Sequence, residues 1–115
     1  MSYNCAPLRC LLALCIASVT HVAAPDFHQS IEPIFKKRCI GCHGAQQQMG
    51  GVRLDERTAA LAGGYSVPII KPGDGAHSLL LQMITTGKNG KVMPPAGPKL
   101  TAAEVDVIRN WLDAG

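Results

Sequence analysis

The feature that most constrains this chain is the run Cys39-Ile40-Gly41-Cys42-His43, in which a histidine directly follows the second of two cysteines three positions apart. Three kinds of site use these residue types: a covalent haem attachment site, a zinc cluster and a redox-active dithiol. Each kind of site needs a different fold around it. The rest of the chain therefore helps to discriminate between them.

The first 24 residues have the layout of a secretory signal peptide. Arg9 precedes an apolar run from Leu11 to Val19, and small residues follow up to Ala24. The run is short for a membrane span, which takes about 20 apolar residues. Pro25 would hinder cleavage after Ala24, so an uncleaved N-terminal anchor is the alternative. We expect export to the periplasm or cell envelope, with membrane attachment only if this segment is retained.

The remaining residues, 25–115, are expected to form one domain with only two cysteines. A disulfide between Cys39 and Cys42 would close a very short loop and remove little entropy from the unfolded chain, so we expect the two thiols to hold something else. The net charge of the whole chain is only +3. That mild excess argues against nucleic acid as a partner, which would favour a dense basic patch.

Apolar periodicity and helix-end signals predict an all-α domain. We expect a first helix, beginning at Asp26 or Ser30, to deliver Cys39 at its end, and a last helix to start with a capping box of Thr101 and Glu104. The predicted helical segments are 26–39, 55–64, 73–87 and 100–115. No stretch alternates long enough for a sheet, and the links are long and rich in Pro, Gly and Lys. Such loops usually wrap a ligand or carry function.

This setting favours haem at the two cysteines. In c-type attachment the thiols of Cys39 and Cys42 form thioethers with the haem vinyl groups, and His43 reaches the iron as proximal ligand. A zinc site needs four ligands, and no second closely spaced pair is present in 25–115. A dithiol oxidoreductase expects a βαβ setting with the reactive cysteine at a helix N-terminus, whereas this pair follows a predicted helix.

Four residues are candidates for the distal iron ligand. Met93 stands before two prolines that hold the backbone extended and stiff, and it lies far enough from His43 for the chain to pass around the ring. Met83 lies in an apolar helical stretch, Met49 is only six residues from His43, and His77 is near a helix start. We therefore favour Met93. Histidine with methionine raises the reduction potential and leaves no open iron position, as in an electron carrier.

Charged residues near the motif suggest further contacts. Arg53 could pair with a haem propionate or, equally, with Asp55 or Glu56. Six basic residues are either solvated surface charges or a rim that steers acidic redox partners: Lys36, Lys37, Arg38, Lys88, Lys91 and Lys99.

Four motifs, in order, resemble the cytochrome c domain of planctomycete type: "IEPIFKKRCIGCHG", "GGVRLDERTAALAGG", "IIKPGDGAHSLLL" and "MPPAGPKLTAAEVDVIRNWLDAG". The resemblance runs from about Phe27 to Gly115. It implies the helical class I cytochrome c fold with one haem c, attached at Cys39 and Cys42, with His43 proximal and Met93 distal.

The sequence thus predicts an extracytoplasmic monohaem cytochrome, not an enzyme, that passes single electrons between transient partner proteins. The resemblance also implies an alternative, because such domains often form the N-terminal module of a larger exported protein. The chain would then be an electron-entry module or fragment of an oxidoreductase or hydrolase-like protein with a larger catalytic domain or subunit. A haem sensor, in which Met93 leaves to admit a gas, is a third hypothesis.

Overall fold

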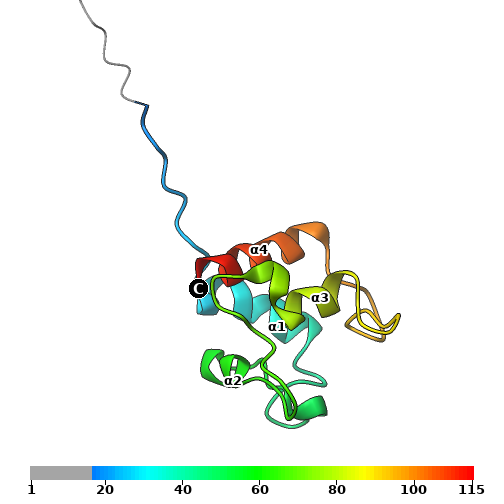
Figure 1. Ribbon diagram of the computed structural model, residues 1–115. Helices are drawn as coiled ribbons and strands as arrows, with labels where there is room; N and C mark the ends of the chain where they lie inside the picture. The colour runs from blue at the N-terminus through cyan, green and yellow to red at the C-terminus, as the bar shows by residue number, and fades with distance from the viewer. Residues whose placement is uncertain (1–16) are drawn as a thin grey trace, which may run out of the picture.

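A computed structural model describes residues 17–115, in which all regular elements are helical and no strand is present. The elements are a π-helical turn η1 (Phe27–Ile31), α1 (Glu32–Arg38), a 3₁₀ turn η2 (Met49–Gly51), α2 (Arg57–Ala62), a 3₁₀ turn η3 (Gly75–His77), α3 (Leu79–Thr85) and α4 (Ala102–Ala114). The predicted all-α class is confirmed. In Figure 1, α1, α3 and α4 are grouped together and α2 lies below them.

The N-terminal segment 17–26 has no regular structure and leads away from the helical body in Figure 1. Most of the predicted signal peptide, including the larger part of its apolar run, lies outside the described residues. Within residues 17–115, no helix combines the length and apolar character needed to cross a membrane.

The first helix begins where the sequence predicted. The carboxylate of Asp26 accepts a hydrogen bond from the backbone N–H of Gln29, 3.0 Å away, and caps η1. The backbone N–H of Glu32 then bonds to the carbonyl of Phe27, which makes the turn wider than an α-helical one. Pro33 lies in the first turn of α1, where its missing N–H costs little. The helix ends at Arg38, and Cys39 is its C-cap.

The single helix predicted over 73–87 is wrong, because the chain breaks at Ser78. Asp74 caps only the short η3, and the extended backbone of Ser78 separates η3 from α3. The buried Ser78 hydroxyl accepts a hydrogen bond from the N–H of Lys71 at 2.9 Å and donates to the carbonyl of Asp74 at 3.0 Å. A serine that bonds to nearby backbone in this way competes with helix continuation.

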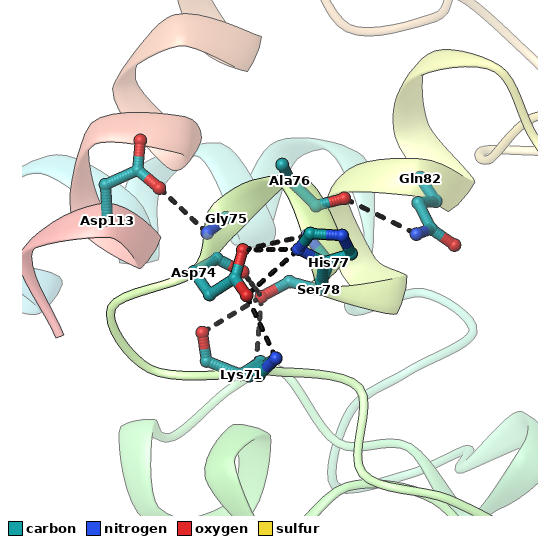
Figure 2. A network of polar contacts seen from close by, with 8 residues as sticks. All are labelled: Lys71, Asp74, Gly75, Ala76, His77, Ser78, Gln82 and Asp113. Carbon is teal, nitrogen blue, oxygen red and sulfur yellow. Dashed lines mark hydrogen bonds and ion pairs between the residues drawn. The ribbon is translucent and has the colours of Figure 1, made fainter.

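Figure 2 shows how this segment is fixed to the last helix. Asp74 contacts both Lys71 Nζ, at 3.0 Å, and His77 Nδ1, at 2.8 Å. Asp113 of α4 accepts a hydrogen bond from the N–H of Gly75 at 2.8 Å. A Cβ on Gly75 would lie 2.7 Å from that carboxylate oxygen, so a larger residue here would displace the Asp113 side chain.

The core is built where η1, α1 and α4 meet. Phe27 lies 5.7 Å from Trp111 and 6.3 Å from Phe35 between ring centroids, at angles typical of favourable aromatic pairs. Ile108 and Leu112 of α4 are buried against them. The capping box is confirmed: Thr101 accepts from the N–H of Glu104, and the Glu104 carboxylate accepts from the N–H of Thr101.

Candidate functional site

The Cys39–His43 run forms one compact turn at the end of α1. The carbonyl of Cys39 accepts hydrogen bonds from the backbone N–H of Cys42, at 3.2 Å, and of His43, at 2.9 Å. Both cysteines are free thiols and half-buried. The turn therefore holds two unpaired thiols and an imidazole within five residues, attached to the core by the helix that precedes them.

Backbone hydrogen bonds also fix the loop that follows this turn. The N–H of Met49 bonds to the carbonyl of Cys42 at 3.0 Å, and the N–H of Leu54 bonds to the carbonyl of His43 at 2.8 Å. Gly44 is buried, and a Cβ on it would lie 2.5 Å from the carbonyl oxygen of Ile40. Only glycine allows the chain to pass so close to the turn.

The His43 side chain contains a buried polar atom that forms no hydrogen bond with the described residues. Its Nδ1 is buried and has no hydrogen-bond partner within the described part of the chain. A buried polar atom left in that state costs about 1–3 kcal/mol. In a histidine that binds a metal, one ring nitrogen holds the ion and the other usually donates a hydrogen bond. The residues present therefore fit a haem iron at His43.

The surroundings of Cys39 do not suit a redox-active dithiol. Burial raises the pKa of the Cys39 thiol to about 11, against a smaller opposing effect of Arg38. Reactive dithiols require a lowered pKa at a helix N-terminus, and Cys39 lies at a helix C-terminus. For the zinc hypothesis, residues 17–115 offer no cluster of three or more His, Cys, Asp or Glu side chains arranged to hold a metal ion.

Met93 lies in the loop between α3 and α4, half-buried against the same core that Cys39 contacts. Its backbone N–H donates to the carbonyl of Met83 in α3 at 2.7 Å. The ammonium of Lys99 donates to the carbonyls of Val92, at 3.1 Å, and of Pro94, on either side of Met93. The loop that carries the predicted distal ligand is thus fixed at Met93.

The other distal candidates are placed differently. Met49 is 52% exposed, and His77 is exposed with its ring held by Asp74. Met83 is half-buried on α3, and its carbonyl is the group that anchors Met93. The four candidates thus differ in burial and in their contacts, and Met93 as distal ligand stays a prediction.

Arg53 pairs with Asp55 and Glu56, which was the alternative to its predicted contact with a haem propionate. Its guanidinium donates to both carboxylate oxygens of Asp55, at 2.9 and 2.6 Å, and lies 3.7 Å from Glu56. This pairing lowers the pKa of Asp55 and raises that of Arg53. The predicted propionate contact stays a prediction.

The sequence did not reveal an ion pair beside the site, between Arg38 and Glu104. Arg38 Nη2 lies 3.1 Å from Glu104 Oε2, and both side chains are largely buried, with exposed fractions of 11% and 17%. The two residues are 66 positions apart, so no local pattern could indicate the contact. The sequence offered only two indications of this ion pair: a basic residue before Cys39 and the glutamate of the capping box.

A small helical domain with two free thiols and a histidine in one turn, and a methionine fixed on a separate loop, has the features of a c-type cytochrome. The family model described as "Planctomycete cytochrome C" matches residues 39–97. The chain belongs to this family, so the predicted resemblance is confirmed. Membership indicates a covalently bound haem and a role in electron transfer. Comparisons with curated proteins and with solved structures gave no match.

Proposed function

We propose that residues 25–115 form a monohaem cytochrome that acts outside the cytoplasm and passes single electrons between partner proteins. The observation that carries this proposal is the turn after α1, in which free Cys39 and Cys42 adjoin a histidine whose buried Nδ1 has no hydrogen-bond partner among residues 17–115. When bound, the haem supplies a one-electron couple between ferric and ferrous iron.

Each residue then has a separate task. The thiols of Cys39 and Cys42 would attach the haem as thioethers, and His43 would bind the iron from the same turn. Met93 would supply a second iron ligand, whose soft sulfur would favour the ferrous state and keep small molecules from the metal. Arg53 would reach a propionate only by sharing or exchanging its contact with Asp55.

Chain topology supports these tasks. The turn that would hold the haem is fixed through α1 to α4, and the Met93 loop is fixed through its backbone to α3. A rigid ligand set changes little between oxidation states, which favours fast electron transfer without bond rearrangement. We therefore assign the domain a carrier role with no catalytic residues of its own.

The proposed ligation is tested by comparing Met93→Ala with Met49→Ala in haem-loaded protein. Met93→Ala should keep its haem, lower the reduction potential by an amount on the order of 100 mV, within the roughly 0.8 V over which axial ligands tune haem, and let ferrous iron bind carbon monoxide. Met49→Ala removes an exposed methionine and should change neither property. An unchanged spectrum and potential in Met93→Ala would assign the distal position to another residue.

A further inference from the structure

The loop between α3 and α4, yellow to orange in Figure 1, has little backbone hydrogen bonding after Met93. Pro94, Pro95 and Pro98 have no N–H and cannot donate such a bond. Among the residues that the structure describes, no backbone–backbone hydrogen bond involves 94–99. The position of the backbone after Met93 therefore depends on contacts with side chains.

The side chain of Lys99 makes such a contact. Its ammonium donates to the carbonyl of Val92, at 3.1 Å, and to that of Pro94, the residues directly before and after Met93. An ammonium has three N–H donors, and hydrogen bonds from a charged donor are stronger than those between neutral groups. Two bonds from one ammonium thus hold the backbone on both sides of Met93.

Lys99 is itself fixed by the residues that follow it. Leu100 is half-buried against the core, and Thr101 is the N-cap of α4. The Lys99 side chain reaches back seven residues to Val92, and so joins the start of α4 to the Met93 segment. Because the Met93 N–H also bonds to a carbonyl of α3, the segment is held from two helices.

The other two lysines of this loop do not make such contacts. Lys88 and Lys91 are exposed, and within residues 17–115 their ammonium groups form no hydrogen bond or ion pair. Replacing either one removes the same charge as replacing Lys99 and leaves the hydrogen bonds around Met93 in place. The loop therefore contains its own controls for an effect of charge alone.

We propose that Lys99 is a positioning residue for Met93, whose two hydrogen bonds keep the thioether where it can bind the iron. The inference rests on the proposed function, in which Met93 is the distal ligand. A methionine on a loose loop is a weak ligand, because its bond must offset the entropy of ordering that loop. With Lys99 in place, the loop is ordered before the bond forms, so Met93 stays bound.

The test compares Lys99→Met with Lys88→Met in haem-loaded protein. Carbon monoxide binds only iron whose sixth position is open. Ferrous Lys99→Met should therefore bind it about five- to tenfold faster than wild type, the effect expected for two exposed bonds from a charged donor. The ferric form should lose part of its sulfur-to-iron charge-transfer band. Lys88→Met should leave the band unchanged, and Lys99→Arg, which keeps a charged donor, should recover most of it.

Amide hydrogen exchange at Met93 provides a second readout, which reports on the loop backbone. Its N–H bonds to the carbonyl of Met83 at 2.7 Å and should exchange faster in Lys99→Met than in wild type. Exchange at the buried Ile108 of α4 should not change. This comparison separates local release of the loop from a loss of global stability.

Equal carbon monoxide rates in Lys99→Met and wild type would overturn the inference. Equal increases in Lys99→Met and Lys88→Met would also overturn it, as would exchange that rises at Ile108 as much as at Met93. Met93→Ala separates this inference from the proposed function. An unchanged rate and band in Met93→Ala would refute Met93 as the ligand, whereas a raised rate there with none in Lys99→Met would refute only the role of Lys99.

Discussion

The guanidinium of Arg38 lies 3.1–3.2 Å from the carboxylate oxygens of Glu104, so the residue before Cys39 is joined to the first turn of the last helix. Glu104 also closes the capping box with Thr101. One carboxylate therefore supports both the start of α4 and the base of the Cys39–His43 turn. The contact has consequences for stability that can be measured.

Glu104→Gln should destabilise the domain by about 2 kcal/mol at pH 7, because the substitution leaves the largely buried Arg38 without its counter-ion. Urea unfolding of haem-loaded protein measures the change. Asp106→Asn, which removes an exposed pair with Arg109 on the same helix, is the control and should cost less than about 0.5 kcal/mol. Equal losses in the two variants would mean that Arg38 and Glu104 do not support the site.

The cost of Glu104→Gln should depend on pH. The hydrogen bond from the Thr101 N–H, followed by the effect of Arg38, holds the pKa of Glu104 below its ordinary value of 4.5. A lowered pKa gives stability that is present above pH 4.5 and is lost as pH falls through the folded pKa. The difference between wild type and variant should therefore shrink below pH 4.5. A difference that is constant down to pH 3 would contradict this origin.

We expect Asp74 to cause a second loss of folding stability in acid, beginning at lower pH than the loss caused by Glu104. Contacts with Lys71 and His77 lower the pKa of Asp74 from 3.8 to about 2. Its contribution to stability should be complete above pH 5 and disappear between about pH 4 and 2. Asp74→Asn should reduce proton uptake on unfolding in that window by up to about one proton, measured from the pH dependence of urea unfolding. Lys71→Met should weaken the same dependence, and a variant slope equal to that of wild type would refute the assignment.

Two glycines of the motif region provide a matched pair. Gly44→Ala would put a Cβ 2.5 Å from the Ile40 carbonyl, whereas a Cβ at Gly41 meets nothing within 4 Å. We expect Gly44→Ala to cost about 1–3 kcal/mol and to lower the yield of haem-loaded protein, with Gly41→Ala close to wild type. Haem content per polypeptide and urea unfolding measure both effects. Loss of haem in Gly41→Ala alone would contradict the observed packing of the turn.

Cys39→Ala with Cys42→Ala should leave a largely unfolded chain. The core of the described residues has only three buried aromatic side chains, and a cofactor that binds only the folded state stabilises that state by mass action. Circular dichroism of the double variant measures the helical content. A compact, cooperatively unfolding apoprotein would show that the polypeptide core is sufficient without haem.

Local signals predicted much of this fold. The capping box at Thr101, the N-cap at Asp26 and the position of Cys39 at a helix end depend on residues a few positions apart, and all were confirmed. The break at Ser78 was missed because it depends on the hydrogen bond from the backbone N–H of Lys71, seven residues earlier, to the Ser78 hydroxyl, which is not a local helix-capping pattern.

The other features that the sequence did not predict depend on contacts between residues far apart in the chain. Neither the Arg38–Glu104 pair nor the bond between Met93 and Met83 follows from a short pattern. The sequence also grouped six basic residues as one set. The fold separates Arg38 and Lys99, which are engaged internally, from Lys88 and Lys91, which are free among the described residues.

The most direct test of the central claim is the intact mass of the denatured protein, produced in a host whose periplasm contains haem-maturation machinery. We predict that the polypeptide carries the mass of one haem, and that Cys39→Ser with Cys42→Ser carries none. The same spectrum reports whether the N-terminal segment has been removed. A wild-type polypeptide that keeps two unmodified thiols after full maturation would contradict the account of this domain as a monohaem cytochrome.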